Sequence, residues 1–223
     1  MNELHAYRKL TKYYNTIYSF KDYKSEAKDI VRLVSKYKRN KGISLLDVGC
    51  RTGMHIKYLK SRYKCVGTDL NEDRLRLARK NVKDVKFVQS DMSNLRIKES
   101  FDVITRLFSA IGHLKTTEKL KKTFGGFYKH LNPGGVYIID AWFDNSHWKE
   151  DSVHMRCHDD KDLKMARVGY SGRRGNMSIS NEHYLIAEKG KGVVYVPDKS
   201  ELRLTERSEF LKLLRAVGFR SIC

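Results

Sequence analysis

Apolar and polar positions follow two different rhythms along this 223-residue chain. Between residues 22 and 37 the apolar residues Ala27, Ile30, Val31, Val34 and Tyr37 recur with charged residues between them, a spacing typical of an amphipathic helix. Elsewhere, short apolar runs that end in acidic or glycine residues predict buried parallel strands. Helical patterns separate most of these runs, which predicts an α/β fold with a mostly parallel sheet and helices on both faces. The expected strands cover residues 43–48, 64–69, 85–89, 101–107 and 136–141.

The part of the chain from about residue 150 to 205 has a different pattern. Its apolar runs are separated by glycine-containing turns, which predicts antiparallel hairpins. Beyond it, Thr205 is expected to cap a last helix that ends at Gly218, and Phe219 is expected to begin a further strand.

Length and composition favour one domain with a substantial core, since 40% of the residues are apolar. No run approaches the roughly 18 apolar residues of a membrane span, and the N-terminus lacks an apolar signal core, so we expect a cytoplasmic protein. The four cysteines are scattered without metal-ligand spacing. Neither a metal site nor a disulfide framework is therefore expected.

The charge is strongly positive, with 45 Lys and Arg against 26 Asp and Glu and a net charge of +19. Such a surplus suits an anionic partner. The positive residues are spread over nearly every segment, however, which also fits a solvated lysine-rich surface. Nucleic-acid binding is therefore possible but not favoured.

The run from Asp47 to Gly53 carries the clearest chemical signal. It follows a predicted strand and precedes a predicted helix, the arrangement in which glycine allows a nucleotide to approach the backbone. A dinucleotide fingerprint that starts at Gly49 would need glycine where Arg51 and Met54 stand, so hydride chemistry is disfavoured.

Two further acidic residues follow predicted strands. Asp69 lies 22 residues after Asp47, close to the spacing at which a carboxylate accepts hydrogen bonds from ribose hydroxyls. The alternative is that Asp69 caps the next helix. Asp91 and Met92 follow the third predicted strand in the same way.

The spacing Asp47-x-Gly49-x-x-x-Gly53 resembles motif I of the class I S-adenosylmethionine-dependent methyltransferases, whose usual form has glycine where Arg51 stands. Arg51 either crowds the methionine portion of the cofactor or meets its carboxylate. The resemblance implies that Asp91 binds the adenine amine and that Met92 packs on the ring. The cofactor-binding residues expected on this basis are Asp47, Gly49, Cys50, Arg51, Gly53, Asp69, Leu70, Asp91, Met92 and Leu107.

The loop after the fourth strand refines the resemblance. It lacks both the Asn/Asp-Pro-Pro-aromatic motif and a Pro-Cys nucleophile, so common nucleobase chemistries are disfavoured. Together with several other segments it is similar to the nucleotide-linked amino-sugar N,N-dimethyltransferases. The matching segments are Tyr14-Asn15, 21–23, 105–116, 131–143 and 189–192.

That resemblance implies roles for acceptor-proximal residues. Tyr14 and His113 are expected to position the acceptor, with base catalysis by His113 an open alternative. Arg173 is expected to meet a phosphate group. The full set of expected substrate-binding residues is Tyr14, Tyr18, Phe108, His113, Trp142 and Arg173.

The expected protein is a Rossmann-like methyltransferase sandwich with an antiparallel β insertion after strand 5 and a shortened C-terminal edge. S-adenosylmethionine would be the cofactor, S-adenosylhomocysteine its product, and a small molecule with an amino group the acceptor, with a homodimer possible. The alternatives are an RNA or protein methyltransferase and a cofactor-deficient binding protein. The expected segments of one domain are an N-terminal aromatic and helical cap (1–42), the cofactor-binding core (43–149), the insertion that caps the acceptor (150–205), and the last helix with the start of a final strand (206–223).

Overall fold

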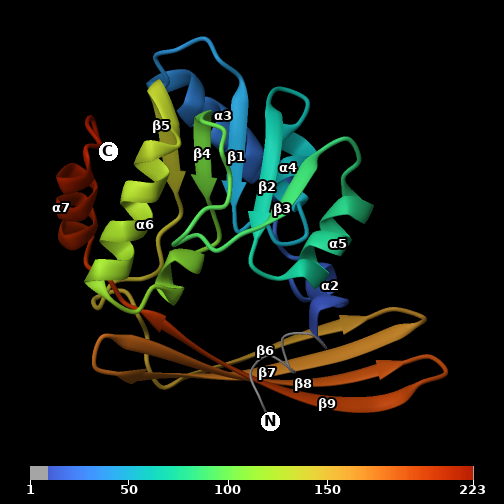
Figure 1. Ribbon diagram of the computed structural model, residues 1–223. Helices are drawn as coiled ribbons and strands as arrows, with labels where there is room; N and C mark the ends of the chain where they lie inside the picture. The colour runs from blue at the N-terminus through green and yellow to red at the C-terminus, as the bar shows by residue number, and fades with distance from the viewer. Residues whose placement is uncertain (1–9, 223) are drawn as a thin grey trace. The chain divides into compact units, whose positions relative to one another are not determined.

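A computed structural model describes residues 10–222 of the chain (Figure 1). The chain divides into two compact units. Of the described residues, the parallel-sheet unit contains 21–142 and 206–222, and the antiparallel unit contains 10–20 and 143–205. The expectation that all segments behave as one domain stays a prediction.

Five parallel strands form the sheet of the first unit, in the order β3-β2-β1-β4-β5. The direction in which the sheet grows reverses beside β1, because β2 and β3 lie on one side of it and β4 and β5 on the other. In open α/β sheets ligands bind at the carboxyl ends of the strands beside such a switch point. The strands are β1 (Ser44–Val48), β2 (Lys64–Asp69), β3 (Lys86–Gln89), β4 (Phe101–Arg106) and β5 (Leu131–Ile139).

Helices cover both faces of this sheet, as Figure 1 shows. Helix α3 buries Ala27, Ile30 and Val34, as its spacing predicts, and the Asp22 side chain caps it by accepting a hydrogen bond from the backbone N–H of Ser25. On the opposite face α6 buries Phe124 completely. One face carries α3 (Tyr23–Tyr37), α4 (Met54–Leu59) and α5 (Glu72–Asn81), and the other α6 (Thr117–Lys129) and α7 (Arg207–Val217).

Two expectations for the end of the chain are wrong. The residue that precedes α7 is Glu206 rather than Thr205, and no side chain caps this helix. Within residues 219–222 no strand forms. Gly218 takes a left-handed conformation with φ 118°, after which the Phe219 ring packs on Tyr137 at a centroid distance of 5.5 Å. This packing keeps the segment among the aromatic side chains of the α6 face.

The antiparallel unit confirms the predicted hairpins. Its four strands pair in sequence order, and α2 (Tyr14–Ile17) belongs to the same unit. One sheet face packs Met165, Tyr184 and Ile186 against residues of the α2 region. The strands are β6 (Ser152–Asp159), β7 (Leu163–Arg174), β8 (Met177–Glu188) and β9 (Gly192–Arg203).

The opposite face of this sheet, here called the outer face, exposes apolar side chains. The strand register aligns Val153 with Tyr170 and Leu185 with Tyr195. Side chains alternate between the two faces of a strand, so these residues share one surface. Its large members are Val153, Met155, Val168, Tyr170, Leu185, Val193 and Tyr195, with exposed fractions from 42% to 79%. Among the described helices, none has the length and apolar character required to span a membrane.

Candidate functional site

The turn between β1 and α4 adopts an unusual backbone. Gly49, Arg51 and Gly53 all have positive φ values, of 71°, 54° and 76°. Glycine tolerates this region at little cost, whereas arginine does not. The turn is tied to the neighbouring strand by a 2.7 Å hydrogen bond from the Cys50 N–H to the Thr68 carbonyl. The predicted nucleotide turn therefore exists, and its one non-glycine left-handed residue is Arg51.

The Arg51 side chain joins this turn to the loop that follows β4. Its Nη1 donates to the Leu107 carbonyl at 3.2 Å and its Nη2 to the Phe108 carbonyl at 2.8 Å. The guanidinium also lies over the Phe108 ring, 4.5 Å from the centroid. Arg51 thus holds together two segments that the sequence places in the cofactor and acceptor sites.

Asp69 lies at the end of β2 with both carboxylate oxygens oriented by backbone N–H groups. Oδ2 accepts from Arg51 at 3.0 Å and Oδ1 from Asn71 at 2.9 Å. The cap of α5 is Asn71, whose side chain accepts hydrogen bonds from the first turn, so the alternative reading of Asp69 as that cap is wrong. Each oxygen of Asp69 retains a lone pair for another donor.

The expected adenine residues follow β3, which pairs with β2. Asp91 is exposed, and its Oδ1 accepts from the Ser93 backbone at 2.7 Å and from the Ser93 hydroxyl at 2.8 Å. Met92 is half-buried, while Leu70 is 65% exposed. The structure brings these residues and Asp69 to the carboxyl ends of adjacent strands.

Three other expected cofactor residues lie deeper in the fold. Asp47 is buried and accepts a 2.8 Å hydrogen bond from the Thr105 hydroxyl, and burial raises its pKa. Cys50 is also buried, which raises the pKa of its thiol well above the usual value. Leu107 is buried, and its carbonyl accepts from Arg51. These three buried residues support the turn from the interior of the protein.

Arg106 is a residue of this region that the sequence interpretation missed. It is only 2% exposed, and its Nη1 donates to the Val48 carbonyl at 2.9 Å and to the Leu107 carbonyl at 3.2 Å. Burial, and then the positive charge of Arg51, lower its pKa to about 10. The available signal was a lone arginine at the end of an apolar strand run.

His113 lies in the short turn η1 (Ala110–His113). Its pKa is lowered to about 4, first by desolvation of the ring among its neighbours and then by the positive charges of Arg106, Arg51 and Arg74, although His113 is an exposed residue by its solvent-accessible area. At neutral pH the imidazole is therefore uncharged. A group with so low a pKa is a weak base, which favours a positioning role over base catalysis.

A series of interacting side chains, which the sequence interpretation also missed, supports the loop after β4. Lys21 pairs with Glu26 at 2.6 Å, and the other oxygen of Glu26 lies 2.7 Å from His55 Nε2. The hydrogen bond with His55 lowers the Glu26 pKa to about 2. Lys21 Nζ also lies 4.3 Å from the centroid of the Phe108 ring, so two cations contact this ring.

The remaining expected acceptor residues are divided between the two units. Trp142 is half-buried in the parallel-sheet unit. In the antiparallel unit Tyr14 is buried, with its ring centroid 4.7 Å from that of Tyr18. Arg173 is exposed, and it donates to the Gly175 carbonyl at 2.8 Å and to Asn145 Oδ1 at 2.9 Å.

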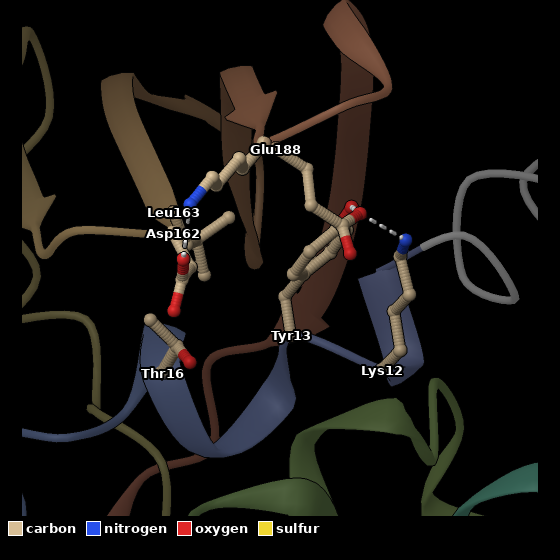
Figure 2. A pocket seen from close by; sticks show the side chains of 7 residues that line it. Lys12, Tyr13, Thr16, Asp162, Leu163 and Glu188 are labelled. Carbon is tan, nitrogen blue, oxygen red and sulfur yellow. Dashed lines mark hydrogen bonds and ion pairs between the residues drawn. The ribbon is translucent and has the colours of Figure 1, made fainter.

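Figure 2 shows a pocket of about 430 Å³ within the antiparallel unit. Lys12 Nζ and the Tyr13 hydroxyl both donate to Glu188 there, at 2.8 and 3.0 Å. None of the predicted site residues lines this pocket. Its lining residues are Lys12, Tyr13, Thr16, Asp162, Leu163, Glu188 and Lys189.

Comparison with known proteins agrees with this geometry. Residues 45–135 match the family described as a methyltransferase domain. The chain is 34% identical over 201 residues to a Streptomyces venezuelae dTDP-3-amino-3,4,6-trideoxy-α-D-glucopyranose N,N-dimethyltransferase, an alignment that covers 90% of this chain and 84% of that protein.

Solved structures extend the similarity to the whole fold. The crystal structure of S. venezuelae DesVI matches with a TM-score of 0.88 and 33% identity, and the match covers 94% of this chain and 89% of that one. CalS10, an amino pentose methyltransferase from Micromonospora echinaspora solved with bound S-adenosylmethionine, matches with a TM-score of 0.83 and 27% identity, and covers 92% of this chain and 87% of that one. This chain therefore belongs to the nucleotide-linked amino-sugar N,N-dimethyltransferases, enzymes of the S-adenosylmethionine-dependent methyltransferase class with a Rossmann-like fold.

Proposed function

We propose that this enzyme methylates the amino group of a nucleotide-linked amino sugar. The observation that carries the proposal is its 34% identity, over 90% of the chain, to an enzyme whose name gives such a substrate. The structural match covers 94% of the chain, so it includes the antiparallel unit as well as the parallel sheet. Similarity over both units supports a shared acceptor class and not only a shared cofactor.

The residues at the carboxyl ends of β1, β2 and β3 fit S-adenosylmethionine, which supplies a methyl group on a positively charged sulfur. Asp69 has two oriented oxygens with lone pairs for the ribose hydroxyls. Asp91 and Met92 would hold the adenine, with Leu70 beside them. The positive φ values of Gly49 and Gly53 shape the turn that approaches the methionine portion. The buried residues Cys50 and Leu107 support this turn.

The charges around His113 favour the reactive form of an amine. An alkyl amine must lose its proton before its nitrogen can attack a methyl group. Nearby positive charges lower the pKa of an amine for the same reason that they lower the pKa of His113. The neutral imidazole of His113 can then accept a hydrogen bond from the amine N–H and orient its lone pair. Orientation of this kind contributes about 7–11 kcal/mol in favourable cases.

The other proposed acceptor contacts follow from side-chain chemistry. Tyr14 is the second positioning residue, and Tyr18, Phe108 and Trp142 offer aromatic surface to a sugar or base. Arg173 is proposed to bind a phosphate of the nucleotide. Two of its nitrogens are already held by Gly175 and Asn145, so the guanidinium is oriented and keeps further N–H donors.

The test compares a dTDP-linked 3-amino sugar with its 3-hydroxy counterpart in the presence of S-adenosylmethionine. We expect methylation of the amino compound only. Tyr14→Phe and His113→Asn should lower kcat while S-adenosylhomocysteine affinity stays near wild type, and the matched control His158→Asn, at a half-buried histidine of β6, should lower neither. A Tyr14→Phe, His113→Asn double variant with wild-type turnover would remove this site assignment.

We also propose that the enzyme is a homodimer joined through the outer face. Contiguous apolar patches of this kind mark interaction sites. A second copy of the same chain presents the same apolar surface, and a twofold axis makes such a surface self-complementary. The exposed fractions of 79% for Val153 and 53% for Leu185 show how much apolar surface the single chain leaves in water.

A cytoplasmic location is proposed on the state of the cysteines. Cys50 and Cys65 are buried free thiols, and Cys157 is an exposed one. Free thiols persist in reducing compartments, where disulfides are rare.

A further inference from the structure

Arg106 is a buried cation that makes no ion pair with any described residue. Its guanidinium has five N–H donors. Nη1 donates to two backbone carbonyls, and Nε has no hydrogen-bond partner. Within residues 10–222 no carboxylate forms an ion pair with it. Burial of an unpaired charge is costly, so the site calls for a negative partner.

A second guanidinium nearby adds to the positive charge that a negative partner would have to balance. Arg51 Nη1 and Arg106 Nη1 both donate to the Leu107 carbonyl oxygen, each at 3.2 Å. One carbonyl dipole does not neutralise two positive charges. The two carboxylates that act on Arg106, Asp47 and Asp69, do so from a distance: neither forms an ion pair with it, and their printed hydrogen bonds are to Thr105 and to backbone N–H groups.

The position of Arg106 links this charge to the cofactor turn. A Cβ built on Gly49 would lie 2.5 Å from Nη1 and 2.9 Å from Cζ of Arg106. The guanidinium therefore lies directly against the backbone of the turn, and only glycine fits above it. This places a positive charge that has no ion-pair partner among the described residues at the turn that approaches the methionine portion of the cofactor.

We propose that Arg106 binds the carboxylate of the methionine portion of S-adenosylmethionine, with Arg51 as a second positive charge beside it. The inference rests on the cofactor-site residues proposed above. The carboxylate is the negatively charged group of this ligand, so it is the part that can compensate a buried cation. A guanidinium also matches the planar, two-oxygen geometry of a carboxylate.

The test measures binding by calorimetry with two probes that differ by one group. The probes are S-adenosylhomocysteine and its decarboxylated analogue, S-adenosyl-3-thiopropylamine. Arg106→Met should raise the dissociation constant of S-adenosylhomocysteine by about 10- to 100-fold, as expected for loss of a hydrogen-bonded charge partner. The same substitution should change the affinity for the analogue by no more than about twofold.

Controls separate this role from a purely structural one. Arg106→Lys keeps the positive charge but lacks the paired N–H donors of a guanidinium. It should weaken binding of S-adenosylhomocysteine by an intermediate amount and leave binding of the analogue unchanged. If Arg106→Met fails to fold, Arg106→Lys provides the comparison of the two probes. Arg32→Met, which removes an exposed positive charge on α3, should leave both affinities unchanged. Equal weakening of both probes in the Arg106 variants would overturn the inference while leaving the cofactor site in place. Failure of the wild-type protein to bind either probe would overturn the cofactor-site assignment as well.

Discussion

Replacement of Arg51 by glycine tests whether this side chain supports or obstructs the cofactor turn. In the structure it is a left-handed residue with φ 54° whose guanidinium donates to two carbonyls and contacts the Phe108 ring. Arg51→Gly removes these contacts and relieves the backbone conformation at the same time. The two effects have opposite signs, so their magnitudes decide the outcome.

The lost contacts outweigh the relieved strain. Two hydrogen bonds contribute about 1 kcal/mol each, and the guanidinium on the ring about 0.5–1 kcal/mol. Relief of the left-handed conformation returns about 1–2 kcal/mol, and the extra freedom of glycine in the unfolded chain takes back about 0.5–1 kcal/mol. The net loss is roughly 2 kcal/mol, which for a chain of this size lowers the melting temperature by about 4–8 °C.

The assay is a thermal melt of each variant with and without S-adenosylhomocysteine. We expect Arg51→Gly to melt lower and to bind the ligand more weakly, because the loop after β4 loses its anchor and the site loses a positive charge. Arg51→Ala keeps the backbone strain, so its free energy of unfolding should be lower than that of Arg51→Gly by about 0.5–1 kcal/mol, and it should melt lower still. A glycine variant that melts like the wild type and binds S-adenosylhomocysteine more tightly would refute the reasoning and show that Arg51 obstructs the site.

Three other predictions follow from the charges and the outer face. An NMR titration should place the His113 pKa near 4, and Arg74→Met should raise it; a wild-type value at or above the usual 6.5 would contradict the proposed field. The Glu26 pKa of about 2 lies below the usual 4.5, so its contribution to folding is present above pH 4.5 and is lost towards pH 2. Glu26→Gln should therefore cost roughly 1 kcal/mol at pH 7, a value reduced by solvent screening, and almost nothing at pH 2, as melts at the two pH values would show. Leu185→Asp on the outer face should convert a dimer to a monomer in sedimentation velocity and lower the melting temperature only by the stabilisation that dimer association supplies, whereas Lys161→Asp in an exposed turn should leave the dimer intact.

Most of the parallel sheet could be predicted because buried parallel strands are short, continuous apolar runs. The exception is β5, which starts at Leu131 rather than at Val136. Leu131 pairs with Phe101, and a register shift before the Val103–Val136 pair accommodates the intervening Asn-Pro-Gly-Gly residues. Locally, proline and glycine predict a turn, and they become part of the sheet only because β5 pairs with β4.

The candidate site divides in the same way between local and distant information. Asp69 could be placed by its spacing from Asp47 and Asp91 by its position after the third predicted strand, because parallel strands end at the same edge of a sheet. The contact of Glu26 with His55, and the position of Arg106 beneath Gly49, join residues 29 and 57 positions apart. No local pattern encodes such contacts. Arg51 shows the same limit: its sequence position leaves open whether it crowds the cofactor or meets its carboxylate, and its hydrogen bonds to the loop after β4 could not be predicted.

The central claim is that this enzyme transfers a methyl group to the nitrogen of a nucleotide-linked amino sugar. The most direct measurement is NMR of the product formed from S-adenosylmethionine that carries a ¹³C-labelled methyl group. We predict a labelled methyl signal correlated with the carbon that bears the amino nitrogen of the sugar. Label on a hydroxyl oxygen or on the nucleobase, or a protein that binds the cofactor yet transfers no label to any amino-sugar nucleotide, would contradict the claim.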